Sequence, residues 1–270
     1  MNDVTFRVII PTYGDCKYLK SAIDSVLQQS YLHLYLIVVH DNYFDEPKLG
    51  NATRHNTHFD YATGHEYSDL YLSNHRWNGG ARNAAMAVNK AKEGIEYIIF
   101  LDHDDTIPNR EVLEHLAKFI EDHKFPDMVR LPYSKKYMSD GHMVHKMLRN
   151  ETTLDICTET VRVAPWTKCI KTSLMPTFPE NTVFEDVIHH LKTCDVCNTY
   201  ALFNEPVVEW RMWDGQTSKR KDDKWQSSEY RFIADLMDLK LNKPITKKRL
   251  ETRLRDAKRA LRDKLNLESI

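Results

Sequence analysis

The clearest structural signal in the chain is Tyr97-Ile98-Ile99-Phe100-Leu101-Asp102-His103-Asp104-Asp105, where an unbroken apolar run meets three carboxylates. The run is too short for a buried helix and is bounded by charge, so it predicts a fully buried β-strand. The carboxylates follow the carboxyl end of that strand, the edge where open α/β sheets bind ligands. Clustered acids repel one another unless a cation lies between them, and oxygen ligands suit Mg²⁺ or Mn²⁺ with substrate phosphates. The competing interpretation is a solvated acidic turn without function.

The amino-terminal part of the chain has the pattern of a βαβ unit. Residues 4–10 are rich in β-branched side chains and end in the turn Pro11-Thr12-Tyr13-Gly14. Apolar residues at helical spacing follow over 18–30, and residues 34–39 form a second strand that stops at His40-Asp41-Asn42. This order predicts a parallel sheet.

Two stretches without periodicity, 43–68 and 134–160, are expected to be loops. The other predicted elements are strands at 69–72, 95–101, 127–132, 166–170, 199–203 and 207–212, and helices at 81–93, 108–123, 184–191 and from about 224 onwards.

The composition predicts an ordinary soluble globular protein. The chain has 270 residues, of which 41% are hydrophobic and 29% charged, enough for one sizeable core. Its apolar runs are too short for a transmembrane segment, and the N-terminus lacks the pattern of a secretory signal. Five scattered cysteines, including an isolated Cys194-x-x-Cys197, favour reduced thiols over disulfides or zinc and suggest a cytoplasmic location.

Charge is unevenly distributed along the chain. Residues 240–264 hold eleven Lys and Arg against three acids, a net charge of +8, whereas the whole chain carries −1. Such a basic segment predicts an anionic partner. The segment also carries a stripe of leucines. Other interpretations of it are a solvated face, a homodimer contact and a peripheral membrane anchor.

Seven short motifs, taken in order, resemble family 2 glycosyltransferases of the GT-A fold over about residues 4–218. They are Val8–Tyr13, Tyr18–Tyr31, Val38–Asn42, Gly79–Asn83, Phe100–Asp105, Pro165–Lys168 and Phe184–Asp186. The resemblance implies an α/β fold with a Rossmann-like nucleotide-binding half and a mostly parallel sheet flanked by helices. It implies a GT-A domain at 1–218, with a donor-binding half at 1–105 and an acceptor half at 106–218. Residues 219–270 then form a basic helical extension.

The resemblance also assigns roles to individual residues. Those implied to bind the donor nucleotide, a UDP-linked sugar, are Pro11, Thr12, Tyr13, Asp41, Arg82 and Asp102. Asp104 and Asp102 match the DxD motif that holds Mn²⁺ or Mg²⁺, and Asp186, beside Glu185, matches the catalytic base of inverting members. The motif of processive polymerases is absent at 209–213, which favours a single sugar addition. At the end of the second strand, His40-Asp41 replaces the family's usual pair of acids, so the resemblance specifies the nucleotide base of the donor less closely.

The chemistry agrees with these roles. A metal held by Asp104 would stabilise the diphosphate leaving group as a Lewis acid. A carboxylate at Asp186 would take the proton of the attacking acceptor hydroxyl, and direct attack would invert the anomeric centre. The alternative role of Asp186 is stabilisation of a helix N-terminus.

The acceptor stays open between a glycan and a hydroxymethylated base in DNA. The basic helix, the run Lys219-Arg220-Lys221 and the nearby Trp210, Trp213 and Trp225 favour DNA, because nucleic-acid surfaces combine phosphate contacts with stacking. The residues expected to contact the acceptor or an anion are Trp166, Lys168, Arg211, Trp213, Arg255, Lys258 and Arg259. Alternative functions are a nucleotide-sugar-binding protein without transferase activity and a nucleotidyltransferase.

Overall fold

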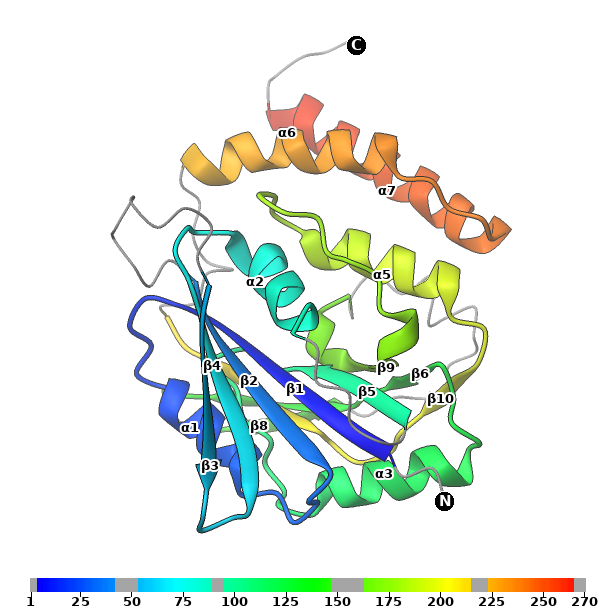
Figure 1. Cartoon of the computed structure of the whole chain (residues 1–270). Coiled ribbons are helices and arrows are strands. Elements are labelled where there is room, and N and C mark those ends of the chain that lie inside the picture. The colour runs from blue at the N-terminus through cyan, green and yellow to red at the C-terminus, as the bar shows by residue number, and fades with distance from the viewer. Residues whose placement is uncertain (1–3, 42–52, 89–94, 147–162, 215–222, 265–270) are drawn as a thin grey trace.

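The computed structural model describes residues 4–41, 53–88, 95–146, 163–214 and 223–264 (Figure 1). The main sheet has the strand order β10-β6-β9-β5-β1-β2-β4-β3. Its strands are β1 (Val4–Tyr13), β2 (Leu34–Asp41), β3 (Thr53–Asp60), β4 (His65–Leu72), β5 (Ile95–Phe100), β6 (Met128–Arg130), β9 (Lys168–Lys171) and β10 (Tyr200–Leu202). A smaller sheet contains β7 (Tyr133–Tyr137), β8 (Met143–Lys146) and β11 (Val208–Met212).

The helices are α1 (Leu19–Leu27), α2 (Trp77–Met86), α3 (Val112–Asp122), α5 (Glu185–Val196), α6 (Asp223–Asp238) and α7 (Pro244–Lys264). Two short 3₁₀ turns are η1 (Pro165–Thr167) and η2 (Thr172–Leu174). Among the described residues, no helix is both long and apolar enough to span a membrane.

The centre of the main sheet is parallel, which confirms the α/β prediction. β1 pairs in parallel with β2 and β5, and β2 pairs in parallel with β4. β9 is inserted antiparallel between β5 and β6. The amino end of β9 therefore lies at the same edge of the sheet as the carboxyl ends of β1 and β5.

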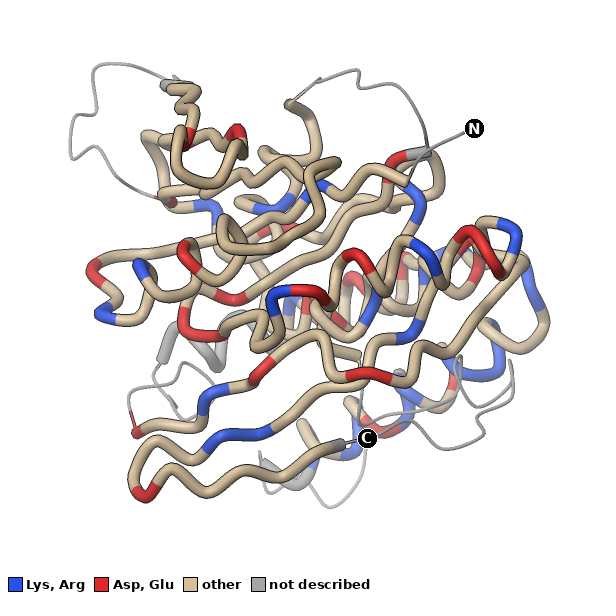
Figure 2. Tube along the Cα trace, turned by 90° about the horizontal axis from the view of Figure 1, so that it is seen from below, with Lys and Arg blue, Asp and Glu red and all other residues tan. Residues whose placement is uncertain are grey.

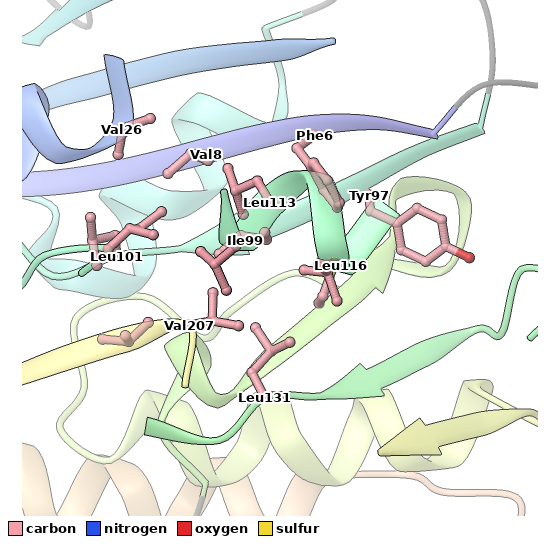
Figure 3. Packing of buried hydrophobic residues seen from close by; sticks show 14 of the residues in the cluster. Phe6, Val8, Val26, Tyr97, Ile99, Leu101, Leu113, Leu116, Leu131 and Val207 are labelled. Carbon is pink, nitrogen blue, oxygen red and sulfur yellow. The ribbon is translucent and has the colours of Figure 1, made fainter. Parts of the chain in front are cut away.

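Helices cover both faces of this sheet. Phe6 and Val8 of β1 pack with Val26 of α1 and with Leu113 and Leu116 of α3 (Figure 3). The intervening residues of β1 and β5 point to the other face and pack against α2; they include Ile9, Ile98 and Phe100. Because neighbouring side chains alternate across the sheet, the near-continuous apolar runs of β1 and β5 satisfy both layers.

The loop predictions at 43–68 and 134–160 were partly wrong. β3 and β4 form an antiparallel hairpin over 53–72, and β7 and β8 form another over 133–146. β3 is the edge strand of the sheet and carries mostly polar side chains, so it lacks the alternation that marks a half-buried strand. The remaining parts of both predicted loops, 42–52 and 147–162, lie outside the described residues.

Several element boundaries also differ from the prediction; the helix expected at 108–123, for example, begins at Val112. β1 continues through Pro11 to Tyr13 in register with β2, and the turn falls at Gly14, which has φ +63°. α2 begins at Trp77, so Gly79 lies inside the helix. An added Cβ at Gly79 would lie 2.2 Å from the carbonyl oxygen of Pro179, so α2 packs on that segment more closely than a side chain allows. The C-terminal helical region is broken into α6 and α7.

α6 and α7 pack on α5, on the side away from the main sheet (Figure 1). Val187, Ile188 and Leu191 of α5 form one apolar cluster with Phe232 and Leu236 of α6. Leu250, Leu254 and Ala257 of α7 join the same cluster. This part of the apolar stripe predicted for the basic helix therefore packs against α5 and α6.

Candidate active site

A cavity of about 420 Å³ opens at the carboxyl ends of β1 and β5. Pro11 of β1 and the segment after β5 line one side, and the first turns of α2 and α5 line the other. The small sheet and η1 contribute aromatic walls. The residues that line it include Trp77, Asn78, Arg82, Asp102, His103, Asp104, Tyr133, Trp166, Phe184, Glu185, Asp186 and Trp210.

Arg82 connects two acids from distant parts of the chain. Its Nη2 donates to Asp102 Oδ1 at 3.0 Å, and its Nη1 donates to Glu185 Oε1 at 2.9 Å. The Arg82 side chain is only 2% exposed, and its guanidinium lies near the rings of Phe100 and Phe178. A buried guanidinium needs such paired acceptors, so Arg82 holds the start of α5 against the end of β5.

Asp104 is held from the opposite wall. The indole Nε1 of Trp213 donates to Asp104 Oδ2 at 2.8 Å, and the Trp213 ring packs edge-on against Tyr18. In the described part of the chain, Asp102 and Asp104 each accept one side-chain hydrogen bond through one carboxylate oxygen. One carboxylate oxygen of each acid is therefore left for a further ligand.

This arrangement fits a divalent cation bound together with a substrate. Within the described ranges, no three His, Cys, Asp or Glu side chains form a metal site by themselves. Mg²⁺ sites often use only one or two carboxylates and complete their shell with substrate phosphates and water. Asp102 and Asp104 provide that partial set.

Glu185 and Asp186 form the first turn of α5. The preceding residue, Phe184, has a left-handed backbone (φ 58°), a conformation found disproportionately at functional sites. Burial raises the pKa of Glu185 to about 7, although the Arg82 guanidinium opposes the shift. Burial also raises the pKa of Asp186, with Lys168 and Arg82 acting against it. Asp186 Oδ1 accepts the N–H of Val187 at 2.9 Å, so the capping role of Asp186 is present alongside its place in the cavity.

The residues expected to bind the nucleotide base meet at the ends of β1 and β2. Asp41 is buried and accepts from His75 Nδ1 at 2.6 Å and from the N–H of Arg76 at 2.8 Å. The Tyr13 side chain is half exposed, and its ring centroid lies 4.4 Å from that of His75. Thr12 is buried and hydrogen-bonded to His103 Nδ1.

The residues expected to contact the acceptor do not lie together in the structure. Trp166 lines the cavity and packs with Tyr133 and Trp210. Lys168 is fully buried, and its ammonium donates to the carbonyl oxygens of Val163 and Ala164, so it stabilises the turn before β9. Arg211 donates through Nη1 to Ser21 Oγ at 2.6 Å. Arg255, Lys258 and Arg259 lie on α7, apart from the cavity lining.

Asp105, the third acid of the stretch 97–105, has a different environment. Asp105 is 1% exposed and accepts the backbone N–H of Arg211 at 2.9 Å, which fixes β11 beside the end of β5. Burial, together with the nearby Asp102 and Asp104 charges, raises its pKa well above the ordinary range. Asp105 is thus a structural acid.

Sequence reasoning missed several residues at the site. His75 and Arg76 bind Asp41, and the missed residues that line the cavity are Trp77, Asn78, His103, Tyr133 and Phe184. Two of them had a usable signal, because His103 lies between two motif acids and Phe184 precedes the Glu-Asp pair. Trp77 had none, since its place depends on where α2 begins.

A mostly parallel sheet with an acidic cavity at its strand ends defines an α/β protein built to bind a ligand at that edge. The chain belongs to glycosyl transferase family 2, because residues 7–170 match the model of that family. The minor teichoic acid biosynthesis protein GgaB of Bacillus subtilis is 25% identical over 250 residues, covering 87% of this chain and 26% of GgaB. An uncharacterized glycosyltransferase of Rickettsia felis is 34% identical over 114 residues, covering 42% of this chain and 17% of that protein. The chain thus spans about a quarter or less of these relatives.

Solved structures show the same fold. Residues 1–349 of S. aureus TarS, in complex with UDP-GlcNAc, superpose with a TM-score of 0.66 at 21% identity, covering 91% of this chain and 70% of that one. The mannosyltransferase PcManGT from Pyrobaculum calidifontis, with GDP-Man and Mn²⁺, gives a TM-score of 0.53 at 15% identity, covering 98% and 76%. These likenesses establish the GT-A fold predicted from the motifs.

Proposed function

We propose that this chain is an inverting glycosyltransferase that moves one sugar from a nucleotide-sugar donor to an acceptor hydroxyl. The observation that carries the proposal is the shared cavity: Asp102 and Asp104 line it from the end of β5, and Glu185 and Asp186 line it from α5. Arg82 bonds to both groups and fixes their separation. Membership of glycosyl transferase family 2 supports the reaction class.

A UDP-linked sugar is the proposed donor. TarS, which shares the fold, was solved with UDP-GlcNAc. In this chain Tyr13 offers a half-exposed ring and Asp41 a buried carboxylate at the strand ends, where the base would lie. Asp102 and Asp104 would hold Mn²⁺ or Mg²⁺, which when bound neutralises charge on the diphosphate. PcManGT, with Mn²⁺ and GDP-Man, supports such a metal.

Asp186 is the proposed general base. The acceptor oxygen forms a bond to the anomeric carbon while the bond from that carbon to the diphosphate oxygen breaks. The hydroxyl proton passes to Asp186, and the electron pair of the broken bond leaves with the diphosphate. Burial raises the pKa of Asp186 and so makes its carboxylate a stronger base. Trp166, Tyr133 and Trp210 form an apolar wall against which a sugar ring would pack.

A glycan is the favoured acceptor. GgaB is named for minor teichoic acid biosynthesis, and neither its name nor that of AmsB refers to DNA. AmsB of Erwinia amylovora is named as an amylovoran biosynthesis glycosyltransferase and is 31% identical over 43% of this chain and 36% of AmsB. DNA is the second candidate, supported by the basic α7. Two of the tryptophans expected to stack on DNA bases have other places in the structure: Trp210 lines the cavity, and Trp213 donates a hydrogen bond to Asp104. Lys219–Lys221 and the Trp225 side chain lie outside the described residues.

The test is a screen of nucleotide sugars for donor hydrolysis and for transfer to defined acceptors, followed by NMR of the anomeric configuration of the product. Asp186→Asn should keep donor affinity and lose about a hundredfold or more in transfer rate, the usual scale for a general base. A product with retained configuration, or a rate within a few-fold of the parent, would contradict the mechanism. Donor binding without any turnover would point to a binding protein, and nucleotide transfer would point to a nucleotidyltransferase.

A further inference from the structure

The outer face of α7 is predominantly basic, and its cations are defined here as the α7 stripe. Its cations, all exposed, are Lys248, Arg255, Lys258, Arg259 and Arg262. A groove of about 560 Å³ is lined by four of them, together with Glu251 and Leu254. Among the α7 residues whose burial the structure describes, the exposed acids are Glu251 and Asp256. On the face of the molecule seen from below, by contrast, basic and acidic residues are interspersed (Figure 2).

The α7 stripe borders the apolar side of the helix, and Leu254 lies where the two meet. Leu250, Leu254 and Ala257 pack against α5 and α6, which uses the surface that a membrane-binding helix would insert. At 1.5 Å per residue, the stripe extends about 21 Å from Lys248 to Arg262, and Arg255 and Arg259 are about 6 Å apart along the axis. This is far longer than a single phosphate or sulfate needs.

The helix that carries the stripe also contacts the catalytic part of the molecule. Arg253 is half-buried on the inner side of α7, where burial lowers its pKa and the Asp186 carboxylate pulls the pKa upward. Phe184, at the cavity wall, packs against Phe232 of α6, which belongs to the cluster beneath α7. The inner side of the helix that carries the α7 stripe therefore lies near the proposed base.

We propose that the α7 stripe binds the acceptor, and that this acceptor is a flexible phosphodiester polymer whose growing end enters the cavity beside Asp186. The inference rests on the proposed transferase function and narrows its glycan acceptor to one whose repeats are joined by phosphodiester links. A phosphodiester chain carries one fixed negative charge per repeat. Guanidinium groups spaced by about one helical turn can pair with successive phosphates.

A flexible chain fits the stripe better than a DNA duplex. The stripe is a single helix wide, and a base in a duplex would have to leave its stack to enter the cavity. Among the described residues that line the α7 groove, none is an aromatic residue that could hold such a base. Duplex DNA is therefore treated as a competing outcome.

The test compares three forms of the full chain. One is the parent; the second combines Arg255→Gln, Lys258→Gln, Arg259→Gln and Arg262→Gln. The third, a charge-matched control, carries Lys20→Gln, Arg110→Gln, Lys118→Gln and Lys124→Gln, all exposed cations on the α1 and α3 side. Each form is titrated with poly(glycerol phosphate), polygalacturonate and duplex DNA at several salt concentrations, and with UDP-GlcNAc and other nucleotide sugars.

The parent and the control should bind poly(glycerol phosphate) with a log–log salt slope of about −3, the value for four contacts to a flexible polyanion. The stripe variant should lose at least tenfold in this affinity and keep its donor affinity. Equal polymer binding by all three forms, or tighter binding of polygalacturonate or DNA than of poly(glycerol phosphate), would overturn the inference. Failure of the parent to bind any nucleotide sugar would instead remove the proposed function, which the donor titration detects separately.

Discussion

At the scale of single residues, Arg82 is the group on which the site most depends. It is buried and bonded to one acid from the sheet and one from α5, so each acid owes its position to the same guanidinium. The sequence motif predicted an arginine near the nucleotide. The ion-pair bridge could not be predicted, because it requires α2 and α5, about a hundred residues apart, to lie side by side.

Replacing Arg82 with Gln should destabilise the fold and loosen the site together. Removing one member of a buried ion pair costs several kcal/mol, and about 3 kcal/mol is expected because Asp102 is partly exposed. Urea unfolding of Arg82→Gln and of the exposed control Arg110→Gln measures this. A loss below 1 kcal/mol would show that the bridge contributes little.

Glu185 should make stability depend on pH. Its pKa rises from an ordinary 4.5 to about 7, so the folded state binds a proton that the unfolded state has already lost. The free energy of unfolding should therefore increase as pH falls from about 7 to about 4.5. Above pH 7 the folded state no longer holds this proton, and the stabilisation it gives should be absent. Glu185→Gln cannot titrate and should flatten the profile in that window. Identical slopes for parent and variant, measured without donor, would contradict the assignment.

Asp104 should govern metal affinity. Asp104→Asn keeps the volume of the side chain and weakens the ligand, so Mn²⁺ binding followed by electron paramagnetic resonance in the presence of UDP should fall at least tenfold. Trp213→Phe is the companion variant, since it frees Asp104 Oδ2 while leaving the carboxylate intact. Unchanged Mn²⁺ affinity in Asp104→Asn would place the metal elsewhere.

At the scale of elements, α2 packs closely against the segment before α5 at Gly79. Among the glycines of the described chain, Gly79 leaves the least room for a side chain. Gly79→Ala would bring its Cβ within 2.2 Å of a backbone oxygen, which cannot rotate away. A loss of about 1–3 kcal/mol in stability is expected, as for other overpacked positions. Thermal unfolding beside the exposed control Asn78→Ala checks it, and equal melting temperatures would show that the segment yields freely.

The sequence predicted most elements that run through the core, because burial on two faces leaves a continuous apolar run in β1, β2 and β5. It failed for β3, β7 and β8, where one face is solvent and the side chains are polar. Asp102, Asp104 and Asp186 were predicted for one site and do line one cavity. Lys168 was expected to contact the acceptor or an anion, but it is buried and its hydrogen bonds go to two backbone carbonyls, which no periodicity reveals.

At the scale of the whole molecule, the order of the sheet explains how one cavity gathers both halves of the chain. β9 runs against its neighbours, so η1 and Trp166 arrive at the edge where β1 and β5 end. Residues before 105 and residues after 163 therefore share that edge, as the division into donor and acceptor halves requires. The division itself stays a proposal.

The concentration of charge on α7 also makes the molecule an electric dipole. Residues 240–264 carry +8 and the whole chain −1, so the remainder carries −9. Near neutral pH the protein has almost no net charge, with a sequence pI of about 6.9, yet it should adsorb to cation-exchange and to anion-exchange resins, each through a different face. At low ionic strength the protein should be retained on both columns. Its solubility there should be low, because opposite faces of neighbouring molecules attract.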